Sequence, residues 1–199
     1  MHEHVDIKTE DNVKLSGDFY KGGEKGIVLL HQLSMTKKSW NEFANELQEK
    51  GYSVIAIDLR GHGQSEGNYK EFSEDDFDDM ILDARAARDF LGKERNAVIG
   101  ASIGANTAIR LAPEVDVAVA LSPGLNYKGI DAEAAAFSVI NPLLIVVSSE
   151  DKYSMDSSEK LHKMILSSEL KVFSGKGHGT NMFDRQTKDF ILNWLEENF

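Results

Sequence analysis

The sequence predicts an α/β protein built on a mostly parallel sheet with helices on both faces. Short, continuous apolar runs recur along the chain, as expected for strands that are buried on both faces. Segments with apolar residues at helical spacing lie between them, and strands that alternate with helices form βαβ units. The apolar runs are residues 26–30, 54–57, 97–99, 115–121 and 143–147, with a weaker run at 170–173.

The chain opens with a different pattern. Residues 5–8 and 13–19 alternate apolar and polar side chains around Asp11-Asn12. Alternation around a turn dipeptide is typical of a hairpin with one face exposed. We therefore expect a β-hairpin at one edge of the sheet.

Helical spacing predicts the elements between the strands. Ser39 with Glu42, Ser73 with Asp76 and Asp156 with Glu159 have the spacing of helix-start pairs. Gly51 is expected to end the first helix. Only about twenty residues separate Leu121 from Leu143, and a short helix is expected over 131–137. That leaves no room for a lid domain. The expected longer helices cover residues 40–47, 77–91, 103–111, 156–165 and 187–195.

Composition limits the class of protein. A length of 199 residues predicts one domain, residues 1–199. The net charge of −11 disfavours nucleic acid or an anionic membrane as the main partner, and the acidic stretch 71–89 is interpreted as a solvated face. The absence of cysteine excludes disulfides, thiolate metal sites and a cysteine nucleophile. Without a signal-peptide pattern or a membrane-length apolar run, a cytoplasmic protein is expected. No metal or cofactor is expected either.

The candidate nucleophile is Ser102, within Gly100-x-Ser102-x-Gly104. A strand is predicted to end at this segment, and a helix to begin directly after it. A serine at such a tight corner is raised above the sheet, and the flanking glycines keep the neighbouring backbone clear of it.

A second G-x-S-x-G match surrounds Ser65, within 63–67. No strand leads directly into this polar, glycine-rich stretch, and no helix leaves it. Ser65 is therefore interpreted as a loop serine without a catalytic role.

A serine nucleophile needs a base and an orienting carboxylate. Among six histidines, His178 is favoured because its glycine-rich loop follows the last strand, at the carboxyl end of the sheet where Ser102 also lies. Asp151, after the strand 143–147, is the favoured acid, with Glu150 and then Asp131 as alternatives. The resulting chain order is serine, acid, histidine.

The developing oxyanion needs backbone N–H donors. Ile103, directly after the serine, is expected to supply one. The second is expected from the loop after the strand 26–30, with Leu33 as first choice and Gln32 as second. His31 is expected to hold this loop by hydrogen bonds rather than to take part in the chemistry.

With these motifs the chain resembles the α/β-hydrolases over nearly its whole length. Leu30-His31-Gln32 lies where the family usually has His-Gly, residues 58–65 are similar to the family's structural Asp-x-Arg-Gly-x-Gly-x-Ser turn, and 100–104 match its nucleophile elbow. The resemblance implies an α/β-hydrolase fold with eight strands, the second antiparallel. It is greatest to small, lid-less carboxylesterases and the dienelactone-hydrolase-like group. Gln32 in place of glycine predicts a differently shaped oxyanion loop, and the lack of cysteine disfavours the dienelactone substrate.

The predicted activity is that of a carboxylesterase-like serine hydrolase that cleaves small carboxylic esters or thioesters through an acyl-enzyme on Ser102. The substrate is thus a small molecule, and the oligomeric state is left open. The alternatives are a ligand-binding or regulatory protein with little turnover, or a thioesterase or peptidase with the same triad. A shallow, open pocket is expected, lined by Leu33, Met35, Trp40, Leu125, Tyr127, Met155 and Met182.

Overall fold

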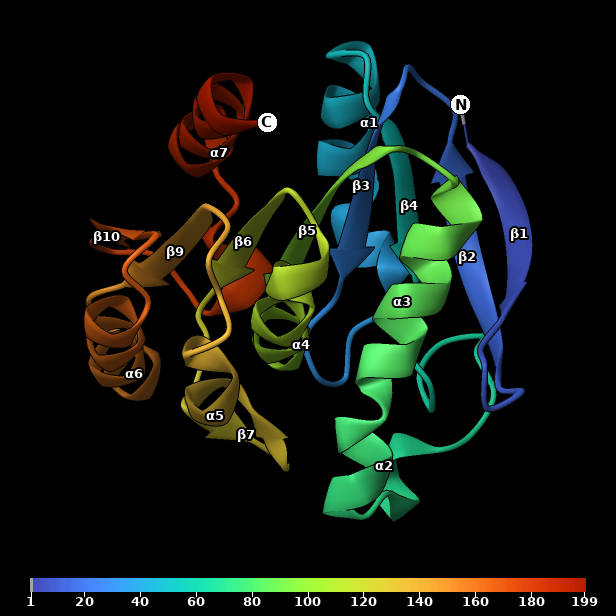
Figure 1. Cartoon of the computed structure of the whole chain (residues 1–199), viewed down its shortest axis with the longest axis horizontal. Helices are drawn as coiled ribbons and strands as arrows, with labels where there is room; N and C mark the ends of the chain where they lie inside the picture. The colour runs from blue at the N-terminus through green and yellow to red at the C-terminus, as the bar shows by residue number, and fades with distance from the viewer. Residues whose placement is uncertain (1) are drawn as a thin grey trace.

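The computed structural model describes residues 2–199 and shows one eight-stranded sheet (Figure 1). Met1, the first residue of the predicted domain, lies outside the described residues. β2 pairs antiparallel with both of its neighbours, β1 and β4, and every other strand pair of this sheet is parallel. In spatial order the strands are β1 (Glu3–Lys8), β2 (Lys14–Tyr20), β4 (Ser53–Ile57), β3 (Lys25–Leu30), β5 (Arg95–Ala101), β6 (Val117–Leu121), β9 (Leu143–Ser148) and β10 (Ser168–Phe173). The eight-stranded, mostly parallel sheet and the N-terminal edge hairpin are confirmed.

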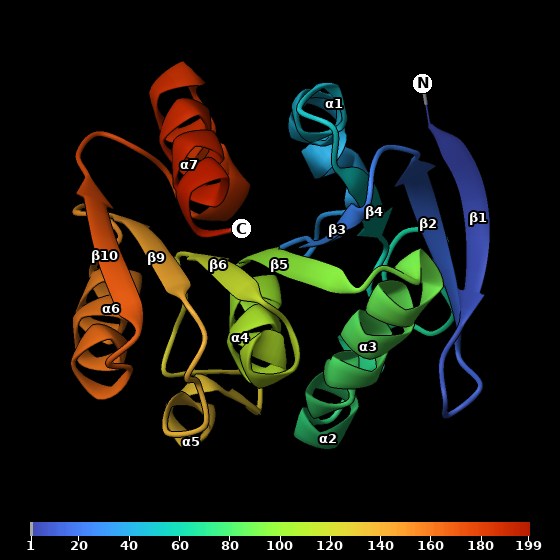
Figure 2. The same ribbon diagram turned by 45° about the horizontal axis from the view of Figure 1, so that its top comes forward.

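Helices cover both faces of the sheet (Figure 2). On one face lie α1 (Asn41–Glu49) and α7 (Arg185–Asn198); on the other lie α3 (Met80–Leu91), α4 (Ile103–Leu111) and α6 (Lys152–Met164). The short α2 (Glu74–Asp78) leads into α3. Turns of 3₁₀ helix occupy Lys37–Trp40, Tyr69–Glu71, Ala112–Glu114 and Gly179–Met182.

The buried strands divide the apolar side chains between two cores. Every residue of β4, β6 and β9 is buried. Because successive side chains of a strand point to opposite faces, Val28 and Leu30 join the core under α3 and α4, while Ile27 and Leu29 join the core under α1 and α7. The continuous apolar runs thus follow from burial on both faces.

Two predicted helix starts are wrong, and one is confirmed. Ser73 and Asp76 form the expected capping box at the start of α2. The Ser39 hydroxyl instead donates to the Thr36 carbonyl inside a 3₁₀ turn, so α1 begins only at Asn41. α6 begins at Lys152 rather than at 156, because the Asp151 carbonyl already accepts the Met155 amide at 2.7 Å.

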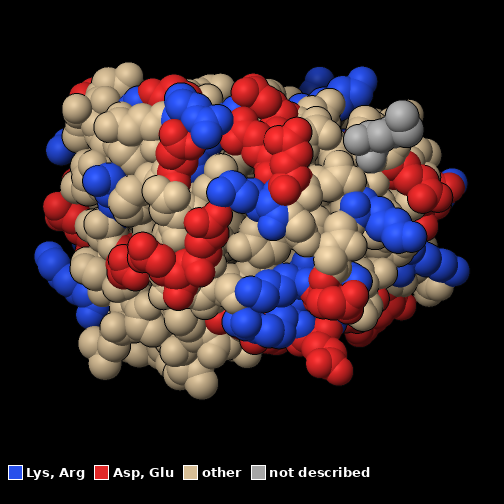
Figure 3. Space-filling view, turned by 90° about the horizontal axis from the view of Figure 1, so that it is seen from above, with Lys and Arg blue, Asp and Glu red and all other residues tan. Residues whose placement is uncertain are grey.

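The segment between β6 and β9 contains only short elements. It holds the hairpin β7 (Asn126–Tyr127) and β8 (Ile130–Asp131), followed by α5 (Ala132–Ala136). Within the described chain there is accordingly no lid domain, as expected. Among residues 2–199, no helix combines the length and the apolar character needed to cross a membrane. Acidic and basic side chains are interspersed on the face shown in Figure 3.

The central strands predict where truncation is most costly. Leu29 is completely buried in β3, whereas Leu166 is 96% exposed. Leu29→Ala is expected to lower the free energy of unfolding by about 2–5 kcal/mol, because it leaves a cavity between packed layers. The control Leu166→Ala should change it by less than about 0.5 kcal/mol. Urea unfolding of both variants checks this, and equal effects would contradict the assigned core.

Candidate active site

Ser102 sits on a sharp turn between β5 and α4. Its φ of 55° and ψ of −115° lie outside the regions that L-residues favour. A Cβ on Gly100 would lie 1.9 Å from the Gly104 carbonyl oxygen, and one on Gly104 would lie 2.4 Å from the Leu30 carbonyl oxygen. Only glycine fits at both positions, so the helix starts directly against the strands and holds the serine in its strained conformation.

Asp151 and His178 are joined at the same end of the sheet. They follow β9 and β10, two adjacent parallel strands, and Asp151 Oδ2 lies 2.5 Å from His178 Nδ1. A carboxylate only accepts hydrogen bonds, so Nδ1 carries the proton of the neutral ring and Nε2 is left as an acceptor. This is the tautomer that a general base for a serine requires.

The two alternative acids have other partners. Glu150 accepts from the Ser148 hydroxyl at 2.7 Å and the Gly175 amide at 2.9 Å, and these hydrogen bonds lower its pKa below the usual range. Asp131 accepts the Ala134 amide at 2.9 Å and thereby caps α5. Of the three candidate carboxylates, Asp151 is therefore the one placed against His178.

Tyr127 of β7 lies beside the candidate triad. Its ring is perpendicular to that of His178, with 6.3 Å between centroids. Burial raises the pKa of Tyr127 to about 12; the hydroxyls of Ser154 and Ser102 oppose that rise, while the Asp151 charge adds to it. The tyrosine hydroxyl itself is hydrogen-bonded to the Ser154 hydroxyl at 2.9 Å. Among residues 2–199 no hydrogen bond links Ser102 to His178, and such contacts often tighten only when substrate binds.

The predicted oxyanion donors come from the expected positions. Ile103 is the first residue of α4, and Leu33 lies in the loop after β3. Within residues 2–199 no protein acceptor is bound to either amide. His31 holds this loop as expected: its Nδ1 donates to the Gln32 carbonyl at 2.8 Å, and its Nε2 accepts the Leu59 amide at 3.0 Å. Burial of the ring lowers the pKa of His31 to about 4.

A buried ionic cluster beneath this loop was not anticipated. The Lys37 ammonium lies 2.6 Å from Ser16 Oγ, 3.1 Å from Asp58 Oδ2 and 3.2 Å from Gln64 Oε1. Ser65 donates its hydroxyl to the Asp58 carbonyl at 2.5 Å and accepts the Ser16 amide, so its role is structural. Asp58 directly follows β4, so its place at the end of a strand could be read from the sequence. Its partner Lys37 lies 21 residues away in the chain, and no local pattern links the two.

The predicted pocket residues divide into two groups. Trp40 and Met182 are completely buried, so the expectation that they line an open pocket is wrong. The 3₁₀ turn ending at Trp40 directs its ring inward, where it packs against Phe43 and Phe183. Partly or well exposed are Leu33, Met35, Leu125, Tyr127 and Met155.

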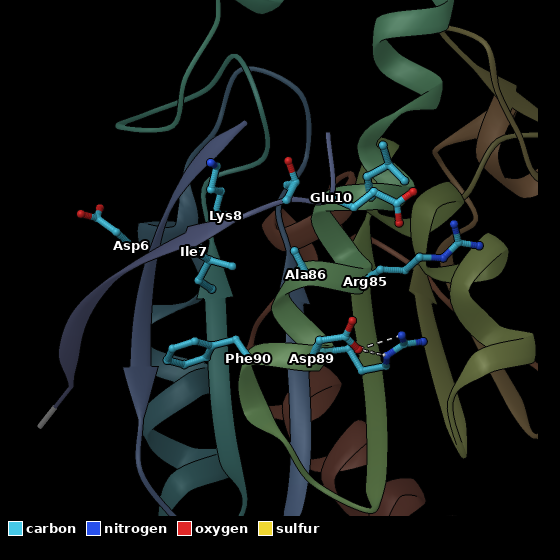
Figure 4. Close-up of a pocket in the computed structure, with 11 residues that line it drawn as sticks. Asp6, Ile7, Lys8, Glu10, Arg85, Ala86, Asp89 and Phe90 are labelled. Atoms are coloured by element: carbon cyan, nitrogen blue, oxygen red, sulfur yellow. Dashed lines mark hydrogen bonds and ion pairs between the residues drawn. The ribbon is translucent and has the colours of Figure 1, made fainter. Parts of the chain in front are cut away.

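A separate groove of about 570 Å³ lies between β1 and α3 (Figure 4). Its lining carries both charges, among them Asp6, Lys8 and Arg85. Arg85 is already paired with Glu114, at 2.6 Å. None of the candidate catalytic residues lines this groove, so it is not part of the site.

The fold and the elbow place the chain in a known class. A sequence model of the alpha/beta hydrolase fold family matches residues 26–127, just over half of the chain, and the chain belongs to this family. It is 35% identical over 104 residues to the AB hydrolase superfamily protein YisY of Bacillus subtilis. That alignment covers 52% of this chain and 37% of YisY, so the chain matches well under half of the relative's length.

Two solved structures share the fold over almost the whole chain. The esterase Pf2001 of Pyrococcus furiosus superposes with a TM-score of 0.83 at 22% identity, covering 100% of this chain and 91% of the esterase. Est1E from Butyrivibrio proteoclasticus, solved with ferulic acid bound, gives a TM-score of 0.81 at 15% identity, with 98% of each chain covered. At these identities the likeness establishes the fold.

The glycines of the elbow lead to a stability prediction. Gly100→Ala places a methyl group 1.9 Å from a backbone oxygen, so we expect a loss of about 3 kcal/mol or more in unfolding free energy, or no folded protein. Gly175→Ala is the control, since φ is +70° there but no atom lies within 4 Å; it should cost only about 1–2 kcal/mol. Thermal unfolding compares the two, and a well-folded Gly100→Ala protein would contradict the close approach.

His31 predicts a pH dependence of stability. In the unfolded chain it takes up a proton as the pH falls through 6.5, whereas the folded protein keeps it neutral until about pH 4. Its contribution is therefore present above pH 6.5 and decreases by up to about 3 kcal/mol as the pH falls to 4. His31→Gln, which keeps a donor and an acceptor, should lose this component. Urea unfolding at pH 7 and pH 5 tests this. An equal change in unfolding free energy between the two pH values for variant and wild type would contradict it.

Proposed function

We propose that the protein is a serine hydrolase that cleaves small carboxylic esters, with Ser102 as nucleophile, His178 as base and Asp151 as the orienting acid. One observation carries the proposal. The Asp151–His178 pair, 2.5 Å apart, lies at the same sheet end as a serine held in a strained strand–helix turn. A serine held in a strained turn, at the same sheet end as an imidazole oriented by a carboxylate, is an arrangement that can activate a serine hydroxyl.

The reaction follows from the placement of these groups. Ser102 Oγ attacks the ester carbonyl carbon and forms a C–O bond while His178 Nε2 takes the hydroxyl proton. Asp151 holds the ring and stabilises the imidazolium. The amides of Ile103 and Leu33, with Gln32 as the alternative second donor, stabilise the tetrahedral oxyanion. Collapse breaks the bond to the alcohol, which leaves with the proton from His178, and water then releases the acid from the acyl-enzyme by the same steps.

The surroundings of Ser102 favour small acyl groups. Ser102 is only 6% exposed, and Tyr127, whose ring lies against that of His178, is half-buried. No lid domain is available among residues 2–199 to enclose a long acyl chain. Pf2001 is described as an esterase, and the acid bound to Est1E is of the kind that ester hydrolysis releases. Small esters or thioesters are accordingly the proposed substrates.

The experiment is labelling with a fluorophosphonate followed by mass spectrometry, together with hydrolysis of p-nitrophenyl esters from acetate to octanoate. We expect an adduct on Ser102 and fastest turnover of the short esters. Ser102→Ala should lose at least about a thousandfold in kcat, since the nucleophile is removed. Ser65→Ala is the matched control and should keep the labelling. An adduct on Ser65, or full activity of Ser102→Ala, would overturn the proposal. A labelled Ser102 without ester turnover would instead favour a binding or regulatory protein.

A further inference from the structure

The side chain of Gln32 connects two loops that are far apart in the sequence. Its Oε1 accepts the Thr180 amide at 2.8 Å and the Thr180 hydroxyl at 3.1 Å. Gln32 follows β3 near the middle of the sheet, whereas Thr180 follows the edge strand β10. One oxygen with two donors uses both of its lone pairs, so the amide is held in a single orientation.

The contact falls directly after His178. A Cβ on Gly179 would lie 2.1 Å from Gln32 Oε1, so the glutamine amide packs against the backbone of the next residue in the chain. The Gly179 amide donates to Ser122 Oγ at 3.0 Å. Two successive amides after His178 are therefore bound by side chains from two other strand ends, Ser122 after β6 and Gln32 after β3.

The loop that carries His178 is rich in glycine. Gly175 and Gly179 adopt positive φ, and no atom lies within 4 Å of a Cβ built on Gly175. Glycine-rich backbone loses more conformational entropy on ordering than other sequences, so the position of His178 depends on anchors outside the loop. Asp151 anchors the ring. On the backbone, Glu150 and Ser148 bind Gly175 and Lys176 before the histidine, and Ser122 and Gln32 bind Gly179 and Thr180 after it.

The other end of Gln32 is fixed in the loop that is proposed to bind the oxyanion. The Gln32 carbonyl accepts from His31 Nδ1 at 2.8 Å and from the Met35 amide at 3.1 Å. The backbone of Gln32 is thus rigid where its side chain departs. Its side chain therefore joins the two loops at a point where the backbone of the first loop is fixed by hydrogen bonds.

We propose that Gln32 is a positioning residue that ties the oxyanion loop to the histidine loop and keeps His178 in register with Ser102. The proposal rests on the proposed serine hydrolase function. Its physical reason is geometric, because a misplacement of about 1 Å at a catalytic group can cost up to about 100-fold in rate. The residue acts through the Thr180 backbone and does not itself touch substrate through its side chain.

The test compares Gln32→Met with Gln32→Glu. Methionine keeps the length of the side chain but removes the acceptor, and kcat for p-nitrophenyl acetate should fall about 10- to 100-fold with KM nearly unchanged. Glutamate keeps an acceptor oxygen and should recover most of that loss. A role in folding alone would lower the free energy of unfolding and leave kcat of the folded protein unchanged.

Thr180→Val is the control on the other side of the contact. It removes the hydroxyl donor and leaves the amide donor, so its effect on kcat should be smaller than that of Gln32→Met. The double variant should lose less than the product of the two single losses, since both remove the same contact. Urea unfolding of each variant separates lost stability from lost kcat.

The outcomes distinguish this proposal from the function on which it rests. Unlabelled Ser102 in the wild-type protein would overturn the serine hydrolase and the role of Gln32 with it. A labelled Ser102 together with wild-type kcat in Gln32→Met would overturn the role of Gln32 alone. If Gln32→Met does not fold, wild-type kcat in Thr180→Val, which removes one of the two hydrogen bonds to Gln32, has the same meaning.

Discussion

The close approach of α4 to the strands beneath it is the constraint on which the site depends. The backbone at Gly104 lies against the carbonyl of Leu30 in β3 and against Gly100 in β5. A helix that starts this close to the sheet leaves Ser102 no room for an ordinary turn, and φ becomes 55°. The strain is maintained because nearly all of α4 is buried and because the Ser102 amide donates to Leu121 of β6 at 2.9 Å.

Parallel strands bring the remaining groups to the same place. β3, β5, β6, β9 and β10 all run in one direction, so their carboxyl ends meet at one edge of the sheet. Each of them is followed by one polar residue of the site: Gln32, Ser102, Ser122, Asp151 and His178. Side chain to backbone hydrogen bonds join these loops to each other, at about 1 kcal/mol each. The site is therefore held by contacts between loops rather than within any one of them.

The polar turn after β4, residues 58–65, is hydrogen-bonded to the segment that follows β3. Asp58 accepts the Lys37 amide at 2.7 Å as well as its ammonium, and Arg60 donates to the buried Asp83 through its backbone and its guanidinium, both at 2.8 Å. Buried charges are tolerated only where they are paired and hydrogen-bonded, so this segment is specified tightly. Ser65 belongs to this tightly hydrogen-bonded turn, which resembles a family motif. Its role there is therefore structural.

Much of the fold and the main features of the site could be predicted because they are local in the chain. A buried strand is a continuous apolar run, and a strand, a tight turn and a helix follow one another directly around Ser102. Such patterns also selected Asp151 and His178, each placed in the loop that follows a strand. The start of α6 at Lys152 was missed because helix-start pairs are weak signals beside the hydrogen bond from Met155 to Asp151.

The sequence by itself determined the order of strands and helices and the residues delivered to the carboxyl edge of the sheet, since periodicity and turn chemistry act over a few residues. Only the tertiary structure decided which side chains face the site. Trp40 turned out to be core, and Gln32 turned out to reach Thr180 across 148 positions of the chain. The physical reason is that burial and side-chain hydrogen bonds are set by neighbours in space, which no local pattern specifies.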